Sequence, residues 1–155
     1  MPNNPLPALL SNRHLLTALT AMMLAQILKV FFDRWRTKSW KKALFFSTGG
    51  MPSSHSALAA AAMMSIGYYE GFETPLFALS CVLALVIMHD AAGIRRAAGK
   101  QAEAINFIFS KLEDQGIKLD KKLKELLGHR PIEVIAGAIL GIVVALLIYA
   151  LFPVM

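Results

Sequence analysis

Two short stretches of this sequence combine histidine with small polar or acidic residues at the start of an apolar run. STGGMPSSH ends in His55, and LGHRPIE holds His129 four residues before Glu133. Paired histidines can supply the nucleophile and the general acid of a phosphoryl transfer that needs no metal. Free backbone N–H groups at a helix start bind anions, and glycines let the backbone come close. The two stretches therefore predict a phosphoryl-transfer site.

Basic residues lie near these histidines in the predicted topology. Lys29 and Arg36 precede the first stretch, and Arg95 and Arg96 follow Asp90. Lysine and arginine bind phosphate oxygens, and arginine can do so with two parallel hydrogen bonds. No dense cluster of Asp and Glu suggests a two-metal site, and a single cysteine excludes a Cys-rich one. We expect neither a metal nor a cofactor.

The elements that must position these residues are apolar helices. The 155-residue chain is 56% hydrophobic and 17% charged, whereas soluble domains carry about 25% charge. Uncharged runs close to the ~20 residues that cross a bilayer indicate an all-α integral membrane protein. We expect one domain, residues 1–155, with about four membrane helices near 14–32, 53–69, 73–90 and 132–152.

The connection 91–131 is predicted to contain an amphipathic helix on the cytoplasmic side. Leu119, Leu123, Leu126 and Leu127 recur at helical spacing among lysines within the segment 112–127. Such a helix is expected either to lie along the membrane surface or to form a solvated helical hairpin.

The basic residues are distributed asymmetrically between the two predicted sides of the membrane. The net charge is +6, and the Lys and Arg residues concentrate in the connections 33–52 and 91–131, with Arg13 on the other side. The positive-inside rule then makes the connections cytoplasmic and puts both termini outside. This predicts a multi-pass protein of a bacterial cytoplasmic membrane with its site facing the cytoplasm. The charge fits a lipid bilayer with anionic headgroups, and no nucleic-acid partner is expected.

The motifs resemble those of the type 2 phosphatidic acid phosphatase superfamily. KVFFDRWR and PSSH correspond to its lysine–arginine and PSGH motifs, and HRPIE corresponds to its His-x3-Asp motif with Glu133 in place of the aspartate. The longer strings STGGMPSSHSA, DAAGIRRAAGKQA and LKELLGHRPIEVIAGAILGI are similar to its divergent bacterial and plastid branch, the YuiD-like membrane proteins. The resemblance runs from about Leu15 to Leu147.

The resemblance implies a role for each matching residue. His129 would be the nucleophile, Glu133 would orient its ring, and His55 would protonate the leaving alcohol. Lys29 and Arg36, with Ser53 and the backbone at Ser54, would hold the phosphoryl oxygens.

Three departures from the family pattern concern phosphate binding. Thr37 replaces a proline and Ser54 a glycine, and Leu123 stands where the third motif has an arginine. Arg95 or Arg96, near Asp90, is expected to supply the missing guanidinium.

Structural explanations compete for some of these residues. Ser53 or Ser54 can cap a helix, Glu133 suits a helix start, and Asp90 can pair with a neighbouring arginine.

The function expected from these residues is hydrolysis of a lipid phosphate monoester, with phosphatidylglycerophosphate as the best single candidate. The alternatives are a polyprenyl phosphate or diphosphate phosphatase, and a lipid-phosphate binding or transport protein without turnover. The GAILG pattern, Gly137–Gly141, permits close helix packing within the chain or in a homodimer.

Overall fold

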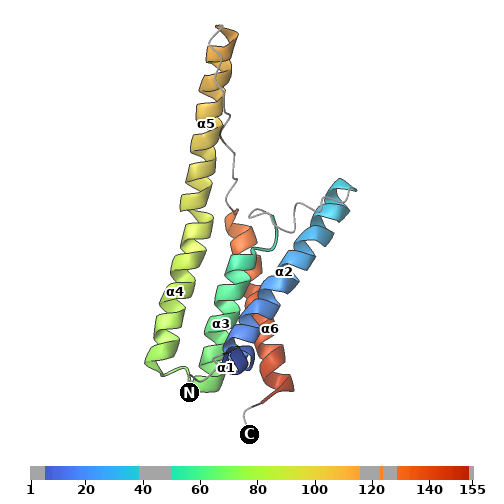
Figure 1. Ribbon diagram of the computed structural model, residues 1–155, viewed down its shortest axis with the longest axis vertical. Helices are drawn as coiled ribbons and strands as arrows, with labels where there is room; N and C mark the ends of the chain where they lie inside the picture. Colours follow the sequence, from blue (N-terminus) through green and yellow to red (C-terminus); the bar gives the residue numbers. More distant parts are fainter. Residues whose placement is uncertain (1–5, 39–49, 116–122, 124–128, 154–155) are drawn as a thin grey trace.

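Six helices make up the part of the chain that the computed structural model describes, which is residues 6–38, 50–115, 123 and 129–153. This part contains no strand, which confirms the all-α prediction (Figure 1). The helices are α1 (Leu6–Leu10), α2 (Arg13–Thr37), α3 (Ser54–Glu70), α4 (Pro75–Ala92), α5 (Ile94–Asp114) and α6 (Pro131–Leu151).

Helix α3 is the centre of the bundle, because it packs against α2, α4 and α6. Its contact surface is built from small residues: Ala57 and Ala61 are fully buried against Ala21 and Ala25 of α2. Small side chains let helix backbones approach closely, so that dispersion contacts can hold the bundle together where lipid offers no hydrophobic driving force.

The glycines of the GAILG motif contact α3 within the same chain. A Cβ atom at Gly137 would collide with the carbonyl oxygen of Ser53, and one at Gly141 with that of Ala57. The prediction of a dimer contact through this face is therefore wrong, since α3 already occupies it. A homodimer would have to use another surface.

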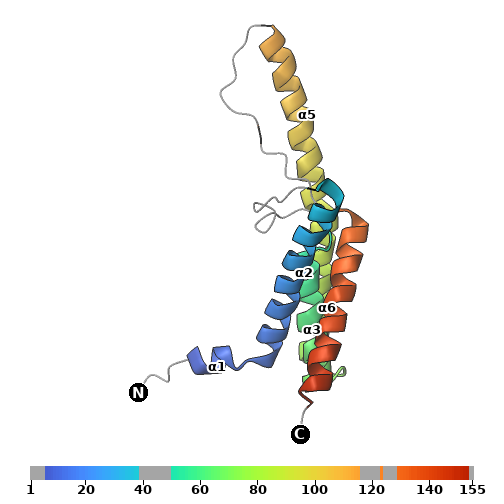
Figure 2. The ribbon, with the colours of Figure 1, turned by 90° about the vertical axis from the view of Figure 1, so that its right-hand side faces the viewer.

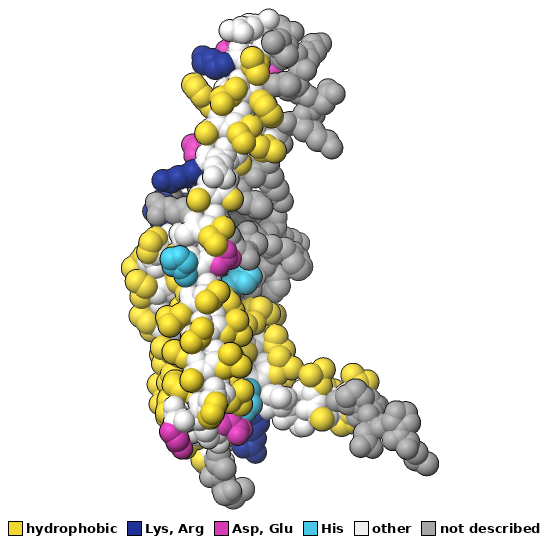
Figure 3. All heavy atoms as spheres, turned by 90° about the vertical axis from the view of Figure 1, so that its left-hand side faces the viewer, with side chains coloured by type: hydrophobic (Ala, Val, Ile, Leu, Met, Phe, Trp, Pro, Cys, Tyr) yellow, Lys and Arg dark blue, Asp and Glu magenta, His cyan; other side chains and the backbone are white. Residues whose placement is uncertain are grey.

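Three segments of the described chain are long and apolar enough to cross a membrane: Arg13–Trp35, Pro75–Asp114 and Pro131–Leu151. Exposed apolar side chains cover the outward face of α4, and charged side chains gather beyond both ends of this apolar zone (Figure 3). Helix α3 has 17 residues, about 25 Å at the usual rise per residue. The predicted count of four membrane helices is therefore approximate, with α3 as a shorter helix enclosed by the others.

The helix found in the long connection is α5, which precedes most of the segment 112–127 that we expected to be helical. Helix α5 continues the direction of α4 and stands away from the end of the bundle instead of crossing it (Figures 1 and 2). Residues 116–122 and 124–128 lie outside the described part. Leu123, which the periodicity placed in a helix, is not helical; its N–H and C=O both bond the Asn106 side-chain amide at 2.8 Å.

Side-chain hydrogen bonds join the helices at the end of the bundle where α2 begins. The two ring nitrogens of His14 bond Ser65 Oγ at 3.0 Å and Glu70 Oε1 at 3.2 Å. In addition, the Tyr69 hydroxyl donates to the carbonyl oxygen of Phe152 at 2.7 Å. These bonds join α2 to α3 and α3 to the end of α6.

Replacing His14 with alanine is expected to destabilise the bundle by about 1–2 kcal/mol, because the buried Ser65 hydroxyl loses its partner. Thermal unfolding of the detergent-solubilised protein, followed by circular dichroism, measures the effect. Ser11→Ala is the control, since the exposed Ser11 hydroxyl donates to the carbonyl oxygen of Ala8, three residues before it in the chain. An unchanged unfolding midpoint for the His14 variant would show that the hydrogen bonds of His14 contribute nothing to the stability of the bundle.

Candidate active site

The predicted site residues converge at one end of the bundle, as the alternating helix directions require. Helix α2 ends there, α3 and α6 begin there, and α4 passes into α5 there (Figure 1). Residues separated by a hundred positions in the sequence therefore lie at the same level.

His129 is buried, with 2% of its surface exposed, and is held on two sides. Its Nδ1 lies 3.0 Å from Glu133 Oε2, and its backbone N–H donates to the carbonyl oxygen of Ala91 on α4. Its other ring nitrogen, Nε2, is buried and has no hydrogen-bond partner within the described chain. A carboxylate on Nδ1 favours the tautomer that carries its proton there, which leaves the Nε2 lone pair free to react.

The start of α6 explains why His129 and Glu133 meet. Arg130 has extended backbone geometry at the N-cap, and Pro131 occupies the first helical position, where proline is favoured. Glu133 therefore stands at the third position, from which its Oε2 accepts a hydrogen bond from the Arg130 N–H at 3.2 Å. The same oxygen reaches His129, so one carboxylate caps the helix and orients the ring.

Helix α3 begins directly against α6. The Ser53 N–H donates to the carbonyl oxygen of Glu133 at 2.9 Å. Its Oγ accepts from both the N–H and the hydroxyl of Ser56, at 3.3 and 2.9 Å. The helix-cap interpretation of Ser53 is thus confirmed, and Ser54 behind it is also buried.

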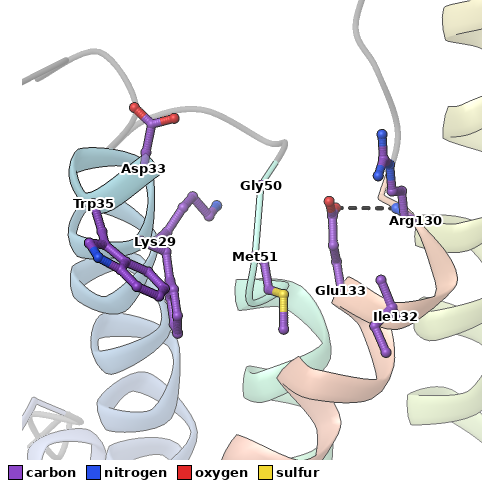
Figure 4. Close-up of a pocket in the computed structure, with 9 residues that line it drawn as sticks. Lys29, Asp33, Trp35, Gly50, Met51, Arg130, Ile132 and Glu133 are labelled. Carbon is purple, nitrogen blue, oxygen red and sulfur yellow. Dashed lines mark hydrogen bonds between the residues drawn. The ribbon is translucent and has the colours of Figure 1, made fainter. Parts of the chain in front are cut away.

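A cavity of about 520 Å³ opens beside Glu133, between α2 and α6 (Figure 4). Lys29 reaches into it from α2, and Gly50 covers the Lys29 stem with a φ of +98° that favours glycine. The lining consists of Lys29, Phe32, Asp33, Trp35, Gly50, Met51, Arg130, Ile132 and Glu133. A basic group, carboxylates and apolar walls therefore share one opening.

Some predicted site residues lie apart from this cavity. Lys29 and Glu133 line it, whereas the exposed His55 does not, so the predicted pairing of His55 with His129 in one pocket is not what the cavity lining shows. Asp90 is half-buried and precedes Ala91, whose carbonyl holds His129. Arg36 lies in α2, and Arg95 and Arg96 lie in α5, with side chains outside the described part.

Sequence reasoning missed two charged residues of the cavity, Asp33 and Arg130. Asp33 stands four residues after Lys29, and residues at that spacing share a helix face, so helical spacing alone could have identified it. Arg130 was taken only as part of the basic connection, although it directly follows His129.

Comparison with known proteins agrees with the motifs. The sequence description of the divergent PAP2 family matches residues 10–144. The chain belongs to this family. It is also 39% identical over 155 residues to the uncharacterized membrane protein YuiD of Bacillus subtilis (strain 168), covering 93% of this chain and 98% of the relative. No solved structure matches the chain.

Membership of the divergent PAP2 family confirms the resemblance and fits a protein of a bacterial membrane with a phosphatase-related role. The geometry around His129 agrees with that role, because it combines an oriented imidazole with an adjacent cavity that Lys29 enters. The described residues contain no group of three or more His, Cys, Asp or Glu placed to hold a metal ion.

Proposed function

We propose that this protein is a membrane phosphatase that hydrolyses a lipid phosphate monoester through a phosphohistidine at His129. The observation that carries the proposal is the state of the His129 ring, in which Nδ1 is bonded to Glu133 and Nε2 is buried without a partner in the described chain. A buried polar atom without a partner costs free energy, and a phosphoryl group at Nε2 would remove that cost.

The reaction takes two steps. The Nε2 lone pair of His129 attacks phosphorus as the bond from phosphorus to the lipid oxygen breaks, and His55 gives its proton to that oxygen. Glu133 offsets the positive charge that develops on the ring. A water molecule then attacks phosphorus and gives a proton to His55, the bond from phosphorus to nitrogen breaks, and inorganic phosphate leaves. Both histidines return to their starting states.

The walls of the cavity favour a lipid as the substrate over a small soluble phosphate. Phe32, Trp35 and Ile132 are exposed apolar residues around the same opening that Lys29 enters. This combination suits a phosphorylated headgroup beside Lys29 and acyl chains along the apolar wall. Arg36 joins Lys29 in this role, with Ser53 and the backbone at Ser54, as the resemblance implies.

Phosphatidylglycerophosphate is our proposed substrate, because the positive-inside rule favours the cytoplasmic face for the basic connections and for the site beside them. A lipid that is phosphorylated where it is made meets a site on that face directly. Asp90 directly precedes Ala91, whose carbonyl oxygen accepts the His129 N–H, so Asp90 belongs to the end of α4 that supports His129.

The proposal predicts phosphate release from phosphatidylglycerophosphate by the detergent-solubilised protein with EDTA present. Replacing His55 with alanine should slow release by about 10²–10⁴-fold, the usual contribution of a general acid. His89→Ala is the matched control, because His89 is an exposed histidine at the end of α4. Equal rates for the wild type and the His55 variant would remove His55 from the mechanism.

The alternative is a lipid-phosphate binding or transport protein without turnover. It is favoured by one observation: Glu133, and not His129 or His55, lines the cavity. Binding of several lipid phosphates without release from any of them would support this alternative and contradict the enzyme.

A further inference from the structure

We propose that Arg130 supplies the guanidinium that binds the phosphoryl oxygens, the role that the sequence pattern assigned to Arg95 or Arg96. The inference rests on the proposed function, because it concerns the phosphate subsite of the same cavity. Arg130 is the arginine that lines this cavity among the described residues.

The backbone of Arg130 is fixed beside the nucleophile. Its N–H donates to Glu133 Oε2, and its carbonyl oxygen accepts from the N–H groups of Glu133 and Val134 at 2.9 and 3.3 Å. Because His129 is the preceding residue, these bonds fix the root of the arginine side chain one residue away from the nucleophile. An arginine held at its root loses less conformational freedom when it closes on an anion.

Arg130 and Lys29 approach the cavity from opposite walls. Figure 4 shows the Lys29 side chain extending from α2 and Arg130 at the start of α6, with the Glu133 side chain between them. Within the described chain, Glu133 accepts a hydrogen bond from the backbone N–H of Arg130, and no ion pair engages the guanidinium of Arg130. A phosphate monoester carries two negative charges, so a buried ammonium on one side and a planar guanidinium on the other match its oxygens.

Asp33 gives the cavity an opposing charge. It lines the same opening from α2, and its Oδ2 lies 3.4 Å from the Thr37 hydroxyl. A carboxylate near a bound phosphate weakens binding by like-charge repulsion. Replacing Asp33 with asparagine removes that charge and keeps an oxygen for Thr37, so this variant should bind phosphate more tightly than the wild type.

The experiment measures binding of inorganic phosphate to the detergent-solubilised full chain by titration calorimetry, together with KM for phosphatidylglycerophosphate. Arg130→Ala should weaken phosphate binding and raise KM by about tenfold or more, as the loss of a charge-assisted pair does. Arg130→Lys should recover part of the loss, because lysine restores the positive charge but cannot donate the two parallel hydrogen bonds of a guanidinium. Lys100→Ala, which removes an exposed cation from α5, is the matched control and should change neither quantity.

Phosphate affinity equal to the wild type in Arg130→Ala would overturn the proposal, above all if Arg95→Ala or Arg96→Ala loses binding instead. A wild-type protein that binds no phosphate would overturn it as well. A wild type that binds phosphate through Arg130 but releases none from any lipid would refute the proposed function alone. The two hypotheses therefore fail separately.

Discussion

Replacing His129 with glutamine is expected to lower phosphate release by at least about 10³-fold, because the loss of a covalent nucleophile removes the reaction path itself. Glutamine keeps a polar side chain of similar reach and can still bond Glu133, so the packing around α6 is retained. Phosphate release under single-turnover conditions separates this loss of chemistry from a change in substrate binding.

Glu133→Gln tests the residue that orients His129 and should have a smaller effect than replacing His129 itself. The amide can still accept the Arg130 N–H bond and cap α6, but it carries no charge to offset the imidazolium that the proposed mechanism forms at His129. We expect a smaller loss than for the nucleophile, about 10–10³-fold in kcat with little change in KM. Full activity in the glutamine variant at position 129 would contradict both predictions at once.

Gly137→Val is expected to be the most damaging change away from the chemistry. Its Cβ would overlap the carbonyl oxygen of Ser53, and backbone cannot move aside as a flexible side chain can. Losing a helix-interior glycine stabilises a helix by up to about 1 kcal/mol, whereas overpacking a tight contact costs about 1–3 kcal/mol or more. The cost of the clash exceeds the gain in helix stability, so the variant should be less stable and its thermal midpoint should fall.

Activity should fall together with stability in this variant. Ser53 donates to the carbonyl oxygen of Glu133, so pushing α3 away from α6 disturbs the residue that orients His129. Ile139→Ala is the matched control, because Ile139 lies on the same helix with 57% of its surface exposed. Equal midpoints for the Gly137 variant and the wild type would mean that α3 and α6 do not pack as described.

Hydrophobic patterning predicts α2, α3, α4 and α6 to within a few residues, because an apolar run of membrane length has few other solutions. The long connection was harder to predict. Leucine spacing in 112–127 suggested the amphipathic helix, yet Ile94–Asp114 is the helix described there. Gly93 lies between α4 and α5 without breaking the run of helical hydrogen bonds. Its N–H donates to the His89 carbonyl oxygen, and its own carbonyl oxygen accepts from the Ala97 N–H. One glycine costs a helix only about 1 kcal/mol, which further hydrogen bonds offset.

In the candidate site, the pairing of His129 with Glu133 could be predicted from the resemblance to the His-x3-Asp motif. In the structure His129 precedes α6, and the carboxylate of Glu133, the third helical residue, reaches back to it. A helix cap was also one interpretation of Ser53 from the sequence. The cavity could not be predicted, since its walls come from α2, α6 and the residues before α3, and no local pattern gives their relative rotation. For this reason Arg130 was missed, and His55 was expected in a cavity that it does not line, whereas Asp33 could have been found from its helical spacing to Lys29.

The most direct test of the central hypothesis is detection of the phosphoryl group on His129. The protein is mixed with phosphatidylglycerophosphate in detergent with EDTA, quenched in base, where phosphohistidine survives, and digested for mass spectrometry. We predict a phosphoryl group on the peptide that holds His129, lost on mild acid treatment and absent from the glutamine variant. Phosphate release without any phosphorylated His129, or with the phosphoryl group on another residue, would contradict the mechanism.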